Sequence, residues 1–246
     1  MKHKVLKKIL GVLNYKLVDK NFFKNNRLIS NNSILNIENL IQKIFKNKIN
    51  QLIQVGANDG ERFDILNKFI KKNKTKSILI EPIKKNFVNL QKSYKNYKFV
   101  KLENVAISVN NEINYLFKVD EKFLKFYDHH IPGITSFSKD HLIKHGVNKT
   151  HIVREKVRTI SIKNILKKYN IKKLDLLFID TEGYDGKIVL DFLKIKNLKP
   201  IIVFEYIHIE NIIFQKVIKR LKNENYKFFP ISENLICFPK NKFFSI

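Results

Sequence analysis

Three carboxylic acids lie within six residues of one another in the stretch LDLLFIDTEGYDG, at the end of an apolar run. They are Asp180, Glu182 and Asp185, and Gly183 between them permits a sharp turn. Acids packed this closely raise one another's pKa or bind a cation, and either effect helps to remove the proton of a hydroxyl group. The alternative is that Asp180 caps the next helix while the other two acids are solvated. We favour Asp180 or Glu182 as the catalytic base, or as the group that orients it.

A second pair of reactive side chains ends the next apolar run, in the stretch FEYIHIE. Glu205 and His208 are expected to face the same cleft as the three acids, because the ends of neighbouring parallel strands meet at one edge of a sheet. A lone histidine is as often a core residue as an acid or base. The acids around it favour a catalytic role for His208, in competition with the carboxylates.

The stretch IQVGANDG is an apolar run that breaks into a loop between Gly56 and Gly60. Glycine lets the backbone pass close to a ligand, and the helix that follows offers its N-terminal amides. Glu81 ends the second apolar run about 25 residues later, where an acid can accept hydrogen bonds from both hydroxyls of a ribose. Because the pattern G-x-G-x-x-G is absent, we expect a nucleoside cofactor and not a dinucleotide.

The elements that must position these residues alternate along the chain. Strands are predicted at 51–55, 77–82, 98–108, 112–120, 175–180 and 200–206, with a terminal hairpin of YKFFPI and LICFP around SEN. Helices are predicted at 32–45 (capped by Asn31, Asn32 or Ser33), 61–72, 85–94, 185–195 and 211–225, and a strand running into a helix at 156–169. This order predicts an α/β fold with a mostly parallel sheet, helices on both faces and an antiparallel strand at or near one edge.

Composition excludes some classes of protein. The single cysteine, Cys237, rules out an intrachain disulfide framework and suits a reducing compartment, so a cytoplasmic location is expected. The formal net charge of +26 accompanies a bias to Lys, Asn, Ile, Phe and Tyr that AT-rich codons produce. We attribute most of the charge to that bias, although it also attracts nucleic acid and acidic lipid surfaces.

Two segments are expected to flank or decorate the fold. Residues 1–48 are interpreted as an N-terminal helical extension and residues 49–246 as the main domain. Apolar residues from Val5 to Leu17 follow helical spacing, which predicts a helix that packs on the core, on a second subunit of a homo-oligomer, or on a membrane surface. No run is long enough to span a membrane.

Residues 121–155 show no clean period and are interpreted as an irregular insertion that forms the wall of the substrate pocket. The insertion holds five histidines, and we find in it no H-x-H or H-x-x-x-H zinc spacing within a recognisable helix.

Seven motifs follow one another along the chain, namely IQVGANDG, LIEP, ENVAIS, GITSFS, VRTISIKNIL, LDLLFIDTEG and PIIVFEY. These motifs, in this order, resemble those of the FkbM-type S-adenosylmethionine-dependent methyltransferases. The resemblance covers roughly residues 50 to 240, and DTEG after an apolar strand is its most specific element. It implies the class I methyltransferase (Rossmann-like) fold, with seven strands of which the last is antiparallel.

The resemblance also assigns roles to residues. It implies that the first loop holds the methionine part of the cofactor, that Glu81 with Pro82 holds the ribose, and that a third segment lines the adenine pocket. The residues so assigned are Gly56, Ala57, Asn58 and Gly60 in the loop, Asn104, Val105 and Ala106 around adenine, Thr135 and Ser136 over the cofactor, and Asp180, Glu182 and Gly183 in the signature. Many members have Asp where this chain has Gln54, so Asp59 or a backbone carbonyl is expected to bind the ammonium group of the cofactor. The last acid of the signature is displaced by one residue, to Asp185.

The function implied is O-methylation of a hydroxyl on a sugar, a glycan or another small natural product. A Mg²⁺ ion held by Asp180, Glu182 and Asp185 is an open alternative to a simple base. Two other functions stay open, a nucleic-acid (RNA) methyltransferase and a non-catalytic nucleoside-binding module. The charge favours the first of these, but the absence of an N-P-P-Y-like segment, which would hold a base amino group, counts against it.

Overall fold

The structure, a computed structural model, describes residues 36–45, 49–62, 64–109, 114–128 and 131–240. The predicted N-terminal helix, the cap at Asn31 to Ser33 and two histidines of the insertion, His129 and His130, lie outside these residues. Within them, no helix is both long and apolar enough to cross a membrane.

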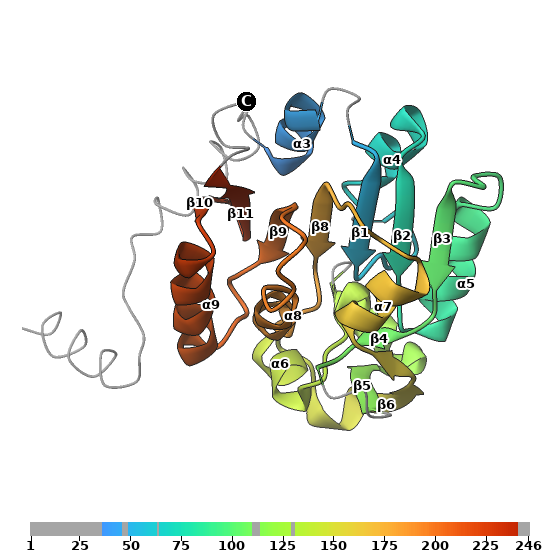
Figure 1. Cartoon of the computed structure of the whole chain (residues 1–246). Coiled ribbons are helices and arrows are strands. Elements are labelled where there is room, and N and C mark those ends of the chain that lie inside the picture. Colours follow the sequence, from blue (N-terminus) through green and yellow to red (C-terminus); the bar gives the residue numbers. More distant parts are fainter. Residues whose placement is uncertain (1–35, 46–48, 63, 110–113, 129–130, 241–246) are drawn as a thin grey trace, which may run out of the picture.

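A seven-stranded sheet forms the centre of the molecule (Figure 1). Its strands are β1 (Gln51–Val55), β2 (Lys76–Ile80), β3 (Val100–Glu103), β8 (Leu176–Ile179), β9 (Ile201–Glu205), β10 (Tyr226–Ile231) and β11 (Asn234–Pro239), in the order β10-β11-β9-β8-β1-β2-β3. The chain builds outward from β1 in one direction to β3 and then returns to the other side of β1 with β8. Strand order therefore reverses between β1 and β8, which is where open α/β sheets bind their ligands.

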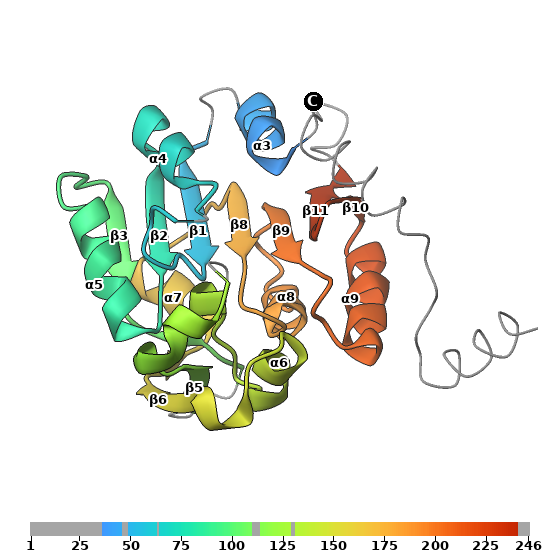
Figure 2. The ribbon, with the colours of Figure 1, turned by 180° about the vertical axis from the view of Figure 1, so that it is seen from behind.

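Both faces of the sheet are covered by helices, as predicted. Alternate residues of each central strand point to opposite faces, so that Ile53 and Leu177 contact one helix layer while Leu52 and Leu176 contact the other. The first layer is α7 (Ile162–Lys168), α8 (Asp185–Phe192) and α9 (Asn211–Asn223), and the second is α3 (Ile37–Phe45), α4 (Asn67–Asn73) and α5 (Lys84–Ser93). Figures 1 and 2 show these two layers from opposite sides. Burial on both faces explains why the strands read as continuous apolar runs.

The terminal hairpin is also confirmed. β11 pairs antiparallel with both β10 and β9, whereas β3, β2, β1, β8 and β9 are all parallel to one another. The antiparallel strand is thus one position in from the edge. This topology is that of the class I methyltransferase fold.

The predicted helix at 61–72 begins later, at Asn67. Side chains compete for the backbone N–H groups that a helix would use: Asp59 accepts from Glu61 and Arg62, and Asp64 accepts from Leu66. Residues before α4 consequently form a loop, and that loop brings Asp64 to the end of the sheet.

The predicted strand at 98–108 is two strands, β3 and β4 (Ala106–Ile107), which belong to different sheets. At the break, the amide of Asn104 donates to the carbonyls of Glu81 and Pro82. β4 pairs with β7 (Thr159–Ile160), and β5 (Asn114–Val119) pairs antiparallel with β6 (Ile152–Val157). These strands lie beyond the arrowheads of β1 and β2 in Figure 1.

The segment expected to be irregular, 121–155, contains several short elements. They are η1 (Glu121–Phe126), η2 (Ile131–Gly133), α6 (Lys139–Lys144), η3 (Lys149–His151) and the first residues of β6. None is long enough to impose a period on the sequence, which explains the irregular pattern.

Candidate active site

A cavity of about 600 Å³ opens at the carboxyl ends of β1, β2, β8 and β9. Its opposite wall comes from β5 and from residues 133–137, in the part of the molecule that lies below the sheet in Figure 2. The cavity therefore occupies the point at which strand order reverses.

The loop after β1 is bound tightly to both neighbouring strands. Gly56 and Ala57 donate their N–H groups to the carbonyl of Ile80, at 2.9 and 3.0 Å. Gly56 has a φ of +86°, and a Cβ on it would lie 1.8 Å from the carbonyl oxygen of Asp180. This position accepts no side chain, because the backbone after β8 fills the space.

Glu81 lies at the end of β2 and is 4% exposed. One carboxylate oxygen accepts the N–H of Asn58 at 3.0 Å, and the other accepts the N–H of Ile83 at 2.8 Å. Burial outweighs these bonds and raises the pKa of Glu81 to about 7. Each oxygen keeps a second lone pair, so the carboxyl can also accept hydrogen bonds from a ligand in the cavity.

Gln54 and Asp64 form a second polar pair in the cavity wall. The amide of Gln54 donates to Oδ1 of Asp64 at 3.0 Å. The other two oxygens, Oε1 of Gln54 and Oδ2 of Asp64, are buried without a hydrogen-bond partner. Burial raises the pKa of Asp64 above its ordinary value. Two buried acceptors without donors indicate a site for a ligand that donates, such as an ammonium group.

The loop after β8 is organised by Asp185, which is fully buried. Its carboxylate accepts the N–H and the hydroxyl of Thr181, at 3.2 and 2.9 Å, and the N–H of Gly183 at 3.2 Å. These bonds hold Glu182 at a φ of +53°, a left-handed conformation that is uncommon outside glycine. The hydroxyl of Ser136 donates to the carbonyl of Glu182 at 2.9 Å and joins the insertion to this loop.

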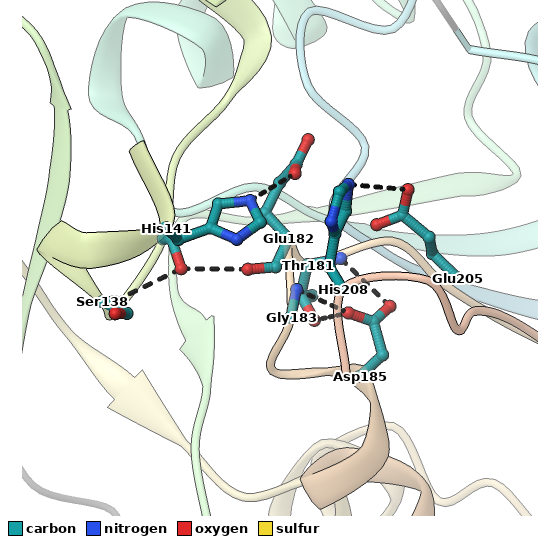
Figure 3. A network of polar contacts seen from close by, with 9 residues as sticks. Ser138, His141, Thr181, Glu182, Gly183, Asp185, Glu205 and His208 are labelled. Atoms are coloured by element: carbon teal, nitrogen blue, oxygen red, sulfur yellow. Dashed lines mark hydrogen bonds and ion pairs between the residues drawn. The ribbon is translucent and has the colours of Figure 1, made fainter. Parts of the chain in front are cut away.

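Figure 3 shows carboxylates and imidazoles facing one another from three segments of the chain. Nε2 of His141, on α6, lies 2.9 Å from Oε2 of Glu182. Nε2 of His208, after β9, lies 3.6 Å from Oε1 of Glu205. The rings of His141, His145 and His208 lie within 4.8 Å of one another, measured between centroids.

The acids at this end of the cavity perturb one another. Burial, together with Asp180 and Glu182, raises the pKa of Glu205 to about 9, so this carboxyl is protonated at neutral pH. The side chain of Asp180 is exposed to the cavity, although most of its wider surroundings are protein. Loss of solvent in these surroundings, together with the charges of Asp185 and Glu182, raises the pKa of Asp180 well above its ordinary value. Burial lowers the pKa of His208.

Comparison with known proteins identifies the family. The family profile described as "Methyltransferase FkbM domain" matches residues 54–228, which is most of the chain. The chain belongs to the FkbM methyltransferase family. Membership implies S-adenosylmethionine as the methyl donor.

Solved structures with related folds are distant in sequence. The chain is similar to a ribosomal protein methylase from Lactobacillus delbrueckii subsp. bulgaricus, with 10% identity, 82% of this chain and 78% of that chain covered, and a TM-score of 0.41. It is similar to the fibrillarin pre-rRNA processing protein of Methanococcus jannaschii, with 11% identity, coverage of 77% and 65%, and a TM-score of 0.40. For the CurJ carbon methyltransferase the values are 10% identity, coverage of 82% and 52%, and a TM-score of 0.42. A search of curated protein sequences finds no match.

Most site residues predicted for this FkbM domain line the cavity. They are Gln54, Gly56, Ala57, Asn58, Glu81, Pro82, Val105, Ala106, Thr135, Asp180, Glu182, Glu205 and His208. Asp59, Gly60, Asn104, Ser136 and Asp185 lie outside its lining. Asp59 binds the backbone of the next turn, Asn104 and Ser136 bind backbone carbonyls, and Asp185 binds its own loop. The structure thus gives these residues supporting contacts.

The proposed magnesium site of three acids is not assembled in the FkbM domain. Across the described residues, the one group of His, Cys, Asp and Glu side chains close enough to hold a metal is His141, His145, Glu182 and His208. Asp185 is excluded because the donors of its loop surround its carboxylate.

Sequence reasoning missed three residues of the site. Asp64 was missed because residues 61–72 were predicted to form one helix, whereas residues before Asn67 form a loop. His141 and His145 have the spacing H-x-x-x-H in HLIKH, so the statement that the insertion lacks it was wrong. α6 is only six residues long, and the sequence therefore gave no helical period that would have drawn attention to this spacing.

The contacts of Asp185 lead to a stability prediction. We expect Asp185→Asn to lower the free energy of unfolding by about 1–3 kcal/mol, because an amide keeps one acceptor oxygen and turns an NH₂ group toward backbone donors. Asp191→Asn is the matched control on α8, where the acid makes an ion pair with Lys194, whose side chain is 71% exposed. Loss of this ion pair should lower the free energy of unfolding by less than about 0.5 kcal/mol. Urea denaturation of both variants measures the difference, and equal midpoints would contradict the organising role of Asp185.

Proposed function

We propose that this methyltransferase transfers a methyl group to a hydroxyl of a sugar, a glycan or another small natural product. The observation that carries the proposal is that one cavity has two ends whose side chains differ in chemistry. The end at β1 and β2 has a glycine loop and a buried acid, and the end at β8 and β9 has carboxylates and imidazoles. The first is suited to a nucleoside cofactor, and the second is suited to a group that must lose a proton.

The residues at the first end fit S-adenosylmethionine. The unpartnered oxygens of Gln54 and Asp64 are acceptors for an ammonium group, so the contact expected from Asp59 or a carbonyl is assigned to Asp64. Gly56 lets the backbone approach the ligand, and Glu81 can accept hydrogen bonds from ribose hydroxyls. Val105 and Ala106 provide apolar surface for an adenine ring.

The residues at the second end bind and deprotonate the acceptor. S-adenosylmethionine, when bound, supplies an electrophilic methyl group. Asp180 is the base we propose, because it lines the cavity directly after β8, where its backbone contacts Gly56 of the loop after β1. Oε2 of Glu182 is already in contact with His141, and Glu205 carries its own proton. The other groups that line this end, Glu205 among them, then orient the acceptor, which is the usual source of a large part of the rate enhancement.

The charge of the cavity argues against RNA as the acceptor. Six of its lining residues are acids, namely Asp64, Glu81, Asp180, Glu182, Glu205 and Glu233, and Arg62 is the sole Lys or Arg among the described residues that line it. Glu205 is protonated at neutral pH, but the other five acids still outnumber Arg62, so the cavity favours a cationic cofactor over phosphate groups. The high net charge of the whole chain is therefore no argument that phosphates enter the active site.

The test is a two-part experiment on the purified protein. Calorimetric titration with S-adenosylhomocysteine should give micromolar binding. Production of S-adenosylhomocysteine from S-adenosylmethionine should then depend on a member of a panel of sugars, glycans and phenols, and be insensitive to added RNA. Binding without turnover on any acceptor would favour a non-catalytic module, and stimulation by RNA alone would favour the nucleic-acid alternative.

The pKa of Glu81 predicts a pH dependence of cofactor binding. Hydroxyl donors favour the ionised carboxylate, so binding should lower this pKa from about 7 and release a proton. Affinity for S-adenosylhomocysteine is expected to fall about tenfold between pH 8 and pH 6. Calorimetry in buffers of different ionisation enthalpy would detect the proton.

Two variants isolate the contribution of Glu81 to this dependence. Glu81→Gln should bind more weakly at pH 8 and lose most of the pH dependence. Glu103→Gln is the matched control, since Glu103 is also buried and is paired with Ile80 at the end of the neighbouring strand, but lies outside the cavity lining. A pH dependence that survives in Glu81→Gln would exclude Glu81 as its source.

A further inference from the structure

Four potential metal ligands converge beside the acceptor end of the cavity. His141 and His145 belong to α6 and its C-cap, Glu182 to the loop after β8, and His208 to the loop after β9. Each can offer one ligand atom, and these atoms all lie within 4.8 Å of one another. The three segments are far apart in the chain, so the fold itself creates this convergence.

The surroundings of the cluster keep it compact. Glu182 is fixed by the contacts of Asp185 and by the hydroxyl of Ser136. Gly183 packs closely against the loop after β9, since a Cβ on it would lie 3.1 Å from the carbonyl oxygen of His208 and 3.8 Å from Nδ1 of His141. Glu205 lies 3.6 Å from Nε2 of His208, in position to orient that ring. An outer carboxylate of this kind commonly sets the tautomer of a metal-binding histidine.

The chemistry of the four side chains selects a class of metal. Three imidazoles and one carboxylate match the nitrogen and oxygen ligands of zinc and related transition metals. Magnesium prefers oxygen ligands alone, in octahedral geometry, so it does not suit this set.

We propose that His141, His145, Glu182 and His208 bind one zinc-class transition metal ion, which fastens α6 and the insertion to the loops after β8 and β9. Four protein ligands complete a tetrahedral shell, as in structural zinc sites. Ligand atoms of such a shell are roughly 3.4 Å apart at the usual bond lengths. The cluster therefore closes by somewhat more than 1 Å at its widest on binding, which rotation of the three imidazoles can provide. The metal site does not depend on the proposed acceptor or on methyl transfer.

The experiment uses the tag-free full-length protein, stripped of metal with a chelator. Titration with Zn²⁺ should give one saturable site per chain, whereas Mg²⁺ should give none. Co²⁺ should develop the visible absorption of tetrahedral cobalt. At a hundredfold excess of zinc over its Kd, the melting temperature should rise by roughly 5–10 °C.

Two variants locate the site. His141→Ala combined with His145→Ala should abolish the binding and the thermal shift. His151→Ala is the matched control, because His151 also belongs to the insertion but stacks on Phe123, outside the cluster. It should bind zinc as the unchanged protein does. Absence of one-to-one binding, or binding that persists in the double variant, would overturn the proposal.

Titration of the same samples with S-adenosylhomocysteine separates this inference from the proposed function. It also shows that the double variant is folded, because the cofactor end of the cavity contains neither substituted histidine. Cofactor binding without zinc binding would overturn the metal site alone. Zinc binding without cofactor binding would overturn the methyltransferase proposal alone.

Discussion

Gly56→Ala should lower the free energy of unfolding by about 3–5 kcal/mol, one of the two largest effects we expect from a single substitution in this chain. Two causes combine. The φ of +86° is unfavourable for any residue with a Cβ, and that Cβ would lie 1.8 Å from the carbonyl oxygen of Asp180. Relief of the clash requires β1 and β8 to separate at their carboxyl ends, where the sheet is fully buried. Urea denaturation gives the free energy.

Gly146→Ala provides a control that separates the two causes. Gly146 has a φ of +83°, and a Cβ on it would meet nothing within 4 Å. Gly146→Ala should therefore lower the free energy of unfolding only through its unfavourable φ, by about 1–2 kcal/mol. Similar losses for the two variants would show that the contact between Gly56 and the backbone after β8 is not as close as described.

This comparison shows what a glycine pattern in a sequence leaves undetermined. The spacing of Gly56 and Gly60 after an apolar run indicated a loop that a ligand can approach. It could not indicate that Gly56 also packs against the backbone of Asp180, which lies 124 positions away in the chain. Close packing between distant segments has no local signature, so a residue of this kind acquires its second role only in the folded sheet.

The fold was predictable because its central elements are strongly apolar and are separated by clear breaks. β1, β2, β8 and β9 were each predicted to within a few residues, and the terminal hairpin was predicted with its turn. Errors occurred where side chains compete with the backbone. Asp59 and Asp64 delay the start of α4, and Asn104 marks the break between β3 and β4. Such bonds depend on which carbonyl or N–H lies nearby, which the sequence does not specify.

The site was predictable to the extent that it follows the ends of the strands. Glu81, Asp180 and Glu205 were found because each lies where an apolar run ends. Asp64, His141 and His145 come from loops and a short helix, whose positions depend on tertiary packing. Prediction from sequence therefore identified the part of the site carried by the sheet and missed the part carried by the connections.

Asp180→Asn should lower turnover by about 10²–10⁴-fold while changing the affinity for S-adenosylhomocysteine much less. An amide preserves the shape of the side chain but cannot accept the proton of a hydroxyl. Glu233→Gln is the control at the cavity mouth, since it removes one negative charge from an exposed residue of the same lining. Turnover with an accepted hydroxyl substrate and calorimetric titration, measured on both variants, give the two quantities.

The pattern of the two effects distinguishes a base from an electrostatic contribution. If Asp180 mainly attracts a cationic cofactor, the two variants should weaken binding to a similar degree, and turnover at saturating cofactor should be almost unchanged. If Asp180 accepts the proton, turnover falls in Asp180→Asn alone and does not recover at any cofactor concentration. Full activity of Asp180→Asn would exclude Asp180 as the base and transfer that role to another group that lines the cavity.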